Sequence, residues 1–298
     1  MLRDRMPFHF IRLRKFWYAI SILLIVPGII SLFSQGLNLG IDFRGGSLLD
    51  LKFNQTIEVD QVRAVMAEFE LADASIQRSG ETDFLVRTRE LSEEENANVI
   101  AALDQRLGGV TVQRSERVGP VIGQELIRNA FLALGVAAVL MVVYIAWRFE
   151  FKQGITAIIA VLHDTLLVTG IFSIFQIEVD SSFVAAILTI IGYSINDTIV
   201  IFDRIRENML NKKKGELLED VINTSLWQTL ARSINTGMSV IFVLVALLLF
   251  GGTTIHNMVL ALLIGVIAGA YSSVCNASPI WYDMKKTELH GKFGTARA

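Results

Sequence analysis

One apolar stretch of the chain, residues 183–202, contains the polar side chains best suited to chemistry inside a membrane. A run of about 20 apolar residues crosses a bilayer as a helix, yet this run includes Ser194, Asn196, Asp197 and Thr198. Asp197 lies 14 residues into the run, which is about 21 Å along a helix that rises about 1.5 Å per residue. An ionisable side chain at that depth costs about 2.5–3.5 kcal/mol on insertion scales. It therefore needs a partner or a proton, which makes Asp197 a candidate functional residue.

A second apolar stretch, residues 227–250, supplies a counter-charge for this carboxylate. Its polar residues follow a spacing that lines one face of a helix, and they are Arg232, Asn235, Thr236 and Ser239. The two stretches form antiparallel neighbouring helices, which brings Arg232 and Asp197 to similar depths, about 7–9 Å from the membrane surface. The residues favour proton or ion coupling at this pair. A purely structural ion pair is the alternative, because membrane helices also use polar side chains to hold one another.

A second polar pair, His163–Asp164, lies within a third apolar stretch, residues 155–175. The simplest interpretation is a polar contact between helices, and a secondary functional site is the alternative. The pair has no obvious third ligand, and the only cysteine is Cys275, so we expect no metal site and no disulfide framework. No Walker A sequence is present, which favours an ion gradient over ATP as the energy source for this chain. We expect no cofactor and no catalytic residues of an enzyme.

Composition predicts a polytopic membrane protein with one polar domain. The chain has 298 residues, of which 52% are hydrophobic and 19% charged, which is too apolar for a soluble protein. Six apolar stretches are long enough to cross a membrane, namely 16–33, 127–147, 155–175, 183–202, 227–250 and 256–281. The first is longer than the about 7–15 residues of a signal-peptide core. We therefore interpret it as an uncleaved helix rather than a signal peptide.

The positive-inside rule predicts the orientation of these helices. Lysine and arginine occur on one side of the predicted bundle, in residues 1–15, 148–152, 204–214 and 285–297. The opposite loops, 176–181 and 251–255, contain none. Both termini are therefore expected in the cytoplasm of a multi-pass membrane protein. The predicted division is a cytoplasmic N-terminus (1–15), a first helix (16–34), an external domain (35–120), five further helices with their loops (121–283) and a cytoplasmic tail (284–298).

The polar segment 35–120 reads as an alternation of strands and amphipathic helices. In order, the predicted elements are a strand at 46–53, a helix at 58–71, strands at 74–78 and 82–89, a helix opening at Ser92 and a strand at 110–118. Ser92 and Glu95 form a capping box at the start of the second helix. This β-α-β-β-α-β order is the ferredoxin-like α+β motif. No basic surface suited to nucleic acid is present.

Three sequence motifs resemble those of a known family. They are GIDFRGGS at residues 40–47, IGYSINDTIVIFDRIREN at 191–208 and NTSLWQTLARSINT at 223–236. By these motifs the chain resembles the SecD/SecF family of bacterial protein-export membrane subunits over residues 15–286. The resemblance implies a six-helix unit like that of the RND transporters.

The resemblance also implies a function, partners and site residues. Such a subunit pairs with SecD and uses the proton-motive force to drive late steps of unfolded-preprotein translocation through the SecYEG channel, after the ATP-driven step of SecA. YajC and YidC are further candidate neighbours in the lipid bilayer. The proton-pathway carboxylate of the family falls on Asp197 and its partner arginine on Arg232. Their polar neighbours Ser194, Asn196, Thr198 and Asn235 complete the predicted pathway.

Two other classes of function remain open at this point. An autonomous secondary transporter would carry a small solute, but the chain shows no inverted repeat of its own. A structural membrane scaffold without ion flux would tolerate Asp197→Asn. Both H⁺ and Na⁺ are compatible with these residues as the coupling ion.

Overall fold

The computed structural model describes residues 8–148, 150–252 and 254–294, which form two compact units. The first unit includes Leu134–Ile177 and the described parts of Met1–Asn38 and Ser182–Ala298. The second unit comprises Leu39–Ala133 together with the short segment Glu178–Ser181. Two distant parts of the chain therefore meet in the second unit.

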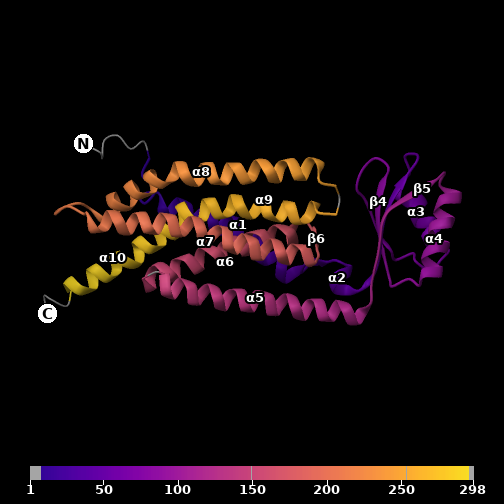
Figure 1. Cartoon of the computed structure of the whole chain (residues 1–298), viewed down its shortest axis with the longest axis horizontal. Coiled ribbons are helices and arrows are strands. Elements are labelled where there is room, and N and C mark those ends of the chain that lie inside the picture. Colours follow the sequence, from indigo (N-terminus) through magenta and orange to yellow (C-terminus); the bar gives the residue numbers. More distant parts are fainter. Residues whose placement is uncertain (1–7, 149, 253, 295–298) are drawn as a thin grey trace. The chain divides into compact units, whose positions relative to one another are not determined.

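The six predicted membrane-spanning helices are confirmed, since the described residues contain six helices of sufficient length and apolarity (Figure 1). They are α1 (Arg14–Ser34), α5 (Pro120–Arg148), α6 (Phe151–Ile174), α7 (Ser181–Leu210), α8 (Leu218–Phe250) and a composite of α9 (His256–Ser272) with α10 (Ser278–Gly294). A π-helical turn, Ser273–Ala277, joins α9 to α10. Such turns are rare and concentrate at functional sites.

Helices α7 and α8 extend beyond the apolar stretches that predict them. Helix α7 continues to Leu210 through the charged run that follows Phe202. Helix α8 begins at Leu218, before the apolar run, with Glu219 and Asp220 in its first turn. Acidic residues at a helix N-terminus interact favourably with the helix dipole, so charged turns lengthen the helices without interrupting them.

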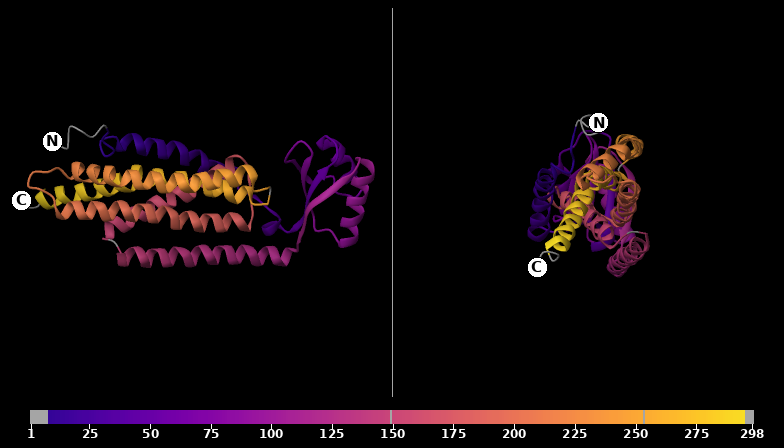
Figure 2. Two further views of the ribbon diagram at one scale, coloured as in Figure 1. Left: turned by 45° about the horizontal axis from the view of Figure 1, so that its top comes forward. Right: turned by 90° about the vertical axis from the view of Figure 1, so that its left-hand side faces the viewer.

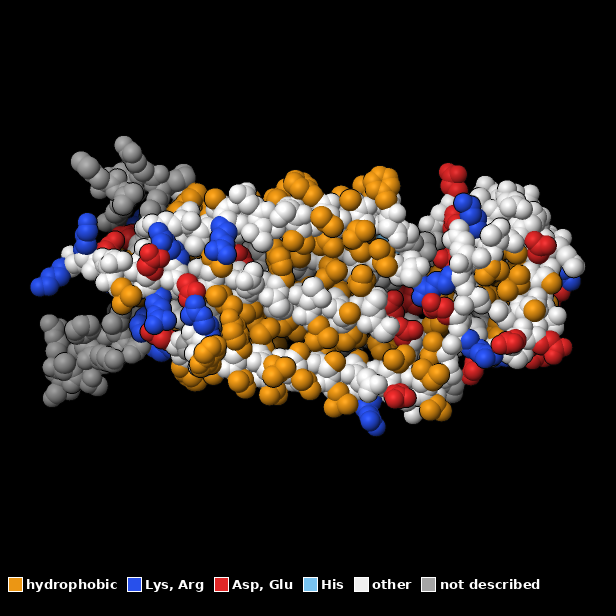
Figure 3. Space-filling view, viewed as in Figure 1, with side chains coloured by type: hydrophobic (Ala, Val, Ile, Leu, Met, Phe, Trp, Pro, Cys, Tyr) orange, Lys and Arg blue, Asp and Glu red, His pale blue; other side chains and the backbone are white. Residues whose placement is uncertain are grey.

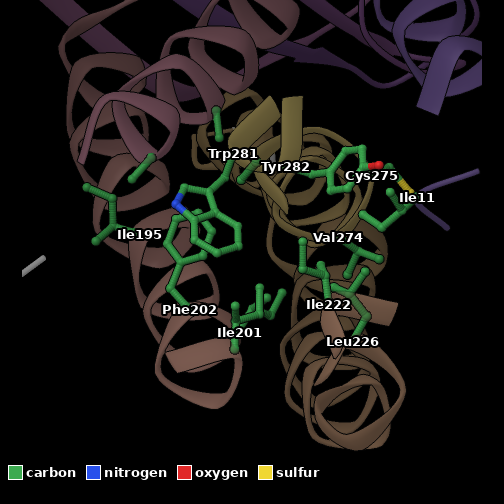
Figure 4. Packing of buried hydrophobic residues seen from close by; sticks show 14 of the residues in the cluster. Ile11, Ile195, Ile201, Phe202, Ile222, Leu226, Val274, Cys275, Trp281 and Tyr282 are labelled. Carbon is green, nitrogen blue, oxygen red and sulfur yellow. The ribbon is translucent and has the colours of Figure 1, made fainter. Parts of the chain in front are cut away.

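Large apolar side chains hold the helices of the first unit together. Phe202 of α7 and Trp281 of α10 pack with ring centroids 6.3 Å apart, within a buried cluster that also holds Ile222 and Leu226 of α8 (Figure 4). Helices α1 and α6 approach so closely that a Cβ on Gly28 would lie 2.7 Å from the Cα of Gly170. Small residues at helix contacts allow such approach in membranes.

The surface of the first unit fits a hydrocarbon environment. Hydrophobic side chains cover the middle of the visible helical face, whereas Lys, Arg, Asp and Glu gather near the turn between α7 and α8 (Figure 3). Leu23 of α1, Val139 of α5 and Phe242 of α8 are exposed hydrophobic side chains of these helices. An apolar band bounded by charges is the pattern of a membrane-embedded bundle.

The second unit is a four-stranded antiparallel sheet with helices α3 (Val59–Ala67) and α4 (Glu93–Arg106) on one side (Figure 2). The strand order is β3-β4-β2-β5, with bounds β2 (Gly46–Phe53), β3 (Ser75–Arg78), β4 (Asp83–Thr88) and β5 (Val110–Val118). The succession of strands and helices is the expected one, while its ferredoxin-like class remains a prediction. Phe53 and Phe84 pack edge to face at 5.5 Å in the buried core between sheet and helices.

The start of α4 and the end of α3 are set by local hydrogen bonds. The capping box of Ser92 and Glu95 is present, with the Glu95 N–H donating to Ser92 Oγ at 3.1 Å. The helix expected over 58–71 ends earlier, at Ala67. Glu70 adopts a positive φ of 60° and the Leu71 N–H donates to the Met66 carbonyl, which is the geometry of a helix-terminating Schellman turn.

Three short elements were not expected from the sequence. They are the helix α2 (Ile41–Arg44) and the two-residue strands β1 (Asn38–Leu39) and β6 (Glu178–Val179). Within the second unit the Gly40 N–H donates to the Val179 carbonyl at 2.8 Å. Strands and helices this short carry no periodic signal in the sequence.

Candidate functional site

Asp197 lies within α7 and contacts α8 through a serine. Its Oδ1 accepts a hydrogen bond of 2.6 Å from Ser233 Oγ. Its Oδ2 is buried and has no hydrogen-bond partner among the described residues. The carboxyl group therefore has one oxygen held by α8 and one oxygen open to a proton or a moving donor.

Arg232 is close to this carboxyl group without pairing with it directly. No ion pair joins Arg232 to Asp197 in the described part of the chain, although Arg232 acts electrostatically on the carboxylate. The reason is the helical phase, because successive residues on a helix point about 100° apart. Ser233 faces α7, whereas Arg232 is exposed.

The other residues of the predicted pathway do not surround Asp197. Ser194 donates to Asp164 Oδ2 at 2.6 Å, and Thr198 Oγ1 lies 2.9 Å from Ser273 Oγ. Ser194 and Thr198 lie one turn apart on the same face of α7, and they contact α6 and the π-helical turn rather than Asp197. Asn196 and Asn235 are exposed on the surface of the first unit. The residues of the predicted proton pathway therefore lie in three separate places: Asp197 beside Ser233, Ser194 and Thr198 in the buried interior, and Asn196 and Asn235 on the surface.

Asp164 is the centre of a second, fully buried site. Its Oδ2 accepts hydrogen bonds from Ser194 of α7 and from Ser272 of α9, the latter at 2.7 Å. Its Oδ1 lies 2.9 Å from Nδ1 of His163. The side chain of Asp164 is completely inaccessible. Buried polar groups in folded proteins have hydrogen-bond partners, and Asp164 has partners on two other helices. The predicted polar contact between helices is therefore confirmed.

The network continues from His163 to α1. Nε2 of His163 lies 3.1 Å from Ser21 Oγ, and Asn276 Nδ2 donates to the same oxygen at 2.9 Å. Tyr271 OH lies 3.2 Å from Ser21 Oγ and donates to the Trp17 carbonyl at 2.9 Å. Four helices, α1, α6, α7 and α9, and the π-helical turn therefore share one polar network.

Sequence reasoning missed several residues that make these contacts, among them Ser21, Ser233, Ser272 and Asn276. A signal for two of them exists, because residues 272–278 form a run of small and polar residues inside an apolar stretch. The π-helical turn falls within this run. Isolated serines such as Ser21 and Ser233 carry no comparable signal, since serine is common in membrane helices as a packing residue.

The exposed polar residues of α7 and α8 form a surface that hydrocarbon alone would not tolerate. Arg232, Asn196 and Asn235 are all exposed within membrane-spanning helices. Charged and amide groups in a span almost always face protein or a water-filled cavity. No group of three or more His, Cys, Asp or Glu side chains suited to a metal occurs in the described ranges.

Comparison with family models gives two matches. The model described as "Protein export membrane protein SecD/SecF, C-terminal" matches residues 99–287. The model described as "SecD/SecF GG Motif" matches residues 30–57. Together they include α7, α8 and the GIDFRGGS motif.

Individual relatives match over almost the whole chain. The "Protein translocase subunit SecF" of Acidaminococcus fermentans is 40% identical over 94% of this chain and 98% of that protein. The protein of the same name from Thermobaculum terrenum is 43% identical over 90% of this chain and 91% of that protein. The crystal structure of SecDF, a translocon-associated membrane protein from Thermus thermophilus, superposes with a TM-score of 0.88 at 34% identity. The superposition includes 95% of this chain and 39% of the longer SecDF chain.

Proposed function

Because the chain belongs to the SecD/SecF family of protein-export membrane proteins, we propose that it is an auxiliary subunit of the Sec protein translocase that converts proton flow into preprotein movement. The family and the near full-length similarity to translocase subunits support the first part. The single observation that carries the second part is the buried Oδ2 of Asp197, which lies inside a membrane-spanning helix and has no hydrogen-bond partner among the residues that the structure describes.

The chemistry of Asp197 fits a two-state proton carrier. In the charged state the carboxylate holds Ser233 and attracts Arg232. Adding a proton to Oδ2 removes that attraction, so the α7–α8 contact is weaker in the neutral state. One charge moved through 100 mV provides about 2.3 kcal/mol. A few protons per cycle are therefore enough to shift a conformational equilibrium that differs by about 5 kcal/mol.

The exposed polar face of α7 and α8 supports a membrane partner. Arg232, Asn196 and Asn235 need polar or protein surroundings in the bilayer. A SecD subunit covers this face in our proposal, consistent with the longer chain of the Thermus SecDF protein, of which this chain spans 39%. SecYEG, SecA, YajC, YidC and the unfolded preprotein are proposed partners on family grounds alone.

The protein is a multi-pass inner-membrane protein by its six helices and its family. Its orientation is a proposal. Lys212, Lys213 and Lys214 lie in the turn between α7 and α8, and positive loops stay in the cytoplasm. The termini are then cytoplasmic and the second unit is periplasmic.

The His163–Asp164 centre is proposed as the secondary polar site of the same unit. Ser194, which donates to Asp164, lies three residues before Asp197 on α7. A rotation of α7 that changes the Asp197–Ser233 contact therefore also moves Ser194. The two sites are linked by one rigid helix.

The deciding experiment measures preprotein export in cells whose only copy of this subunit carries Asp197→Asn. Amide and carboxyl side chains have nearly the same shape, so the variant removes the titratable proton and little else. Asp73→Asn, the same chemical change at an exposed position of the second unit, is the matched control. Membrane accumulation and SecD binding are measured in parallel.

Loss of proton-motive-force-dependent export with normal accumulation and SecD binding supports the proposal. Normal export in Asp197→Asn refutes the proton-carrier role of this residue, favours the scaffold alternative and makes Asp164→Asn the next test. Ion-driven solute transport by the chain without SecD would favour an autonomous transporter instead.

A further inference from the structure

The segment Glu178–Ser181, which leads directly into α7, belongs to the second unit rather than to the helical bundle. It is only four residues long and lies far in sequence from the sheet that holds it. We call it the coupling segment. A short connection between two membrane helices has no need of specific contacts with a separate unit, so the contacts that it makes require an explanation.

The first contact is an ion pair with the sheet. Arg87 of β4 donates from Nε to Glu178 Oε1 at 2.8 Å and from its terminal nitrogen to Oε2. The two side chains are only 14% and 13% exposed. A two-pronged arginine–carboxylate pair fixes both distance and orientation, and partial burial protects it from salt screening.

A second arginine of the sheet adds to this field. The pKa of the Arg114 side chain is raised, first by its hydrogen bond to Glu116 and further by the charges of Asp180 and Asp42. Asp180 belongs to the coupling segment. Arg87 and Arg114 of the sheet therefore both act electrostatically on acidic residues of the coupling segment.

The third contact involves the turn that contains α2. Asp42 Oδ2 accepts hydrogen bonds from the Ser181 N–H at 2.9 Å and from Ser181 Oγ at 2.5 Å. Ser181 is the first residue of α7, so Asp42 binds an N–H of the first turn of α7. A carboxylate at this position satisfies an orphan donor and complements the helix dipole.

Two glycines that flank α2, Gly40 and Gly46, lie where a side chain would collide with neighbouring groups. A Cβ on Gly40 would lie 2.7 Å from Glu178 Oε1. Gly46 has a φ of +129°, and a Cβ there would lie 2.4 Å from the Thr88 carbonyl oxygen. A side chain at position 40 would therefore displace Glu178 from its ion pair with Arg87. A side chain at position 46 would instead disturb the pairing of β2 with β4.

We propose that Arg87, Glu178 and Asp42 are positioning residues that couple α7 to the second unit. The proposal rests on the proposed function of Asp197 in α7, which lies 16 residues after Ser181 on the same helix, about 24 Å along its axis. A shift of α7 is transmitted through the coupling segment to β4 and to the α2 turn. The second unit thereby follows the protonation cycle of the membrane helices.

The test is a charge exchange at the ion pair, in the full chain together with SecD. Arg87→Glu and Glu178→Arg are made singly and together, and two rates of preprotein translocation are measured, with and without a proton-motive force. We expect each single variant to lose most of the proton-motive-force stimulation, towards the level of Asp197→Asn. The double variant should recover it, because the pair is restored with reversed polarity.

Matched controls separate coupling from folding. Exchange of the exposed Arg106–Glu68 pair in the same unit should leave the stimulation unchanged. Gly40→Ala, which crowds Glu178, should reproduce the single-variant loss. Gly135→Ala adds a Cβ in open space and should not.

The outcomes are distinguishable from failure of the proposed function. Loss of stimulation in Asp197→Asn but full stimulation in Arg87→Glu, Glu178→Arg and Gly40→Ala overturns the coupling proposal alone. Equal loss of translocation with and without the proton-motive force indicates a merely structural pair and also overturns it. If the charge-reversed chains fail to accumulate, Glu178→Gln, which keeps the shape of the side chain, decides by the same measurement.

Discussion

The close approach of α1 and α6 gives a prediction whose size can be worked out from distances. In Gly28→Ala the new Cβ would lie 2.7 Å from the Cα of Gly170. Carbon atoms pack at about 3.5–4.0 Å, so the helices must separate by about 1 Å. One turn further along, Ser31 Oγ and Ser173 Oγ share a hydrogen bond of 2.7 Å, and this separation would lengthen it beyond useful range.

The expected loss of stability combines three effects. Overpacking a close contact costs about 1–3 kcal/mol, and each interhelical hydrogen bond lost in a membrane costs about 0.6 kcal/mol. The greater helix preference of alanine over glycine returns up to about 1 kcal/mol. The net destabilisation of Gly28→Ala is therefore about 1–3 kcal/mol.

Equilibrium unfolding of the purified chain in mixed detergent micelles measures this difference. Gly170→Ala should give a similar loss, since its Cβ would lie 2.8 Å from the Cα of Gly28. The double variant should lose less than the sum of the single losses, because the first alanine already separates the helices. Gly135→Ala is the control. Losses below about 0.5 kcal/mol in both single variants, or strict additivity, would refute the proposed contact.

Three further predictions concern other parts of the chain. Phe84→Ala removes a fully buried ring and should destabilise the second unit by about 3–5 kcal/mol, measured by its protease resistance across a urea series. Glu95 has a pKa lowered to about 2, first by the Arg89 side chain and then by Ser92. Its stabilisation is therefore complete above the ordinary value of 4.5 and lost as the pH falls through about 2, so acid unfolding curves of wild type and Glu95→Gln should converge there. Asp164→Ala strands the two buried hydroxyl donors of Ser194 and Ser272 and removes the neighbour of His163 Nδ1. It should lower membrane accumulation far more than Asp164→Asn does, as quantitative immunoblots would show; equal levels would contradict the network.

The positions of the helices and the candidate carboxylate could be predicted from the chain alone. Apolar length, the loop charges and the capping box of Ser92 are properties of neighbouring residues. An aspartate inside an apolar stretch is exceptional wherever the helix lies. Asp197 could therefore be identified without knowledge of its neighbours, as could the order of strands and helices in the second unit.

The partners of these residues depend on packing between segments that are distant in the chain. The rotation of each helix about its axis decided that Ser233, and not Arg232, hydrogen-bonds to Asp197. It also decided that Ser194 donates to Asp164. A rotation of one residue on α8 would have exchanged the first pair, because neighbouring residues on a helix point about 100° apart. The attachment of Glu178 to Arg87 joins residues 91 positions apart. Such pairings are a property of the folded chain, since no local pattern encodes which distant surfaces meet.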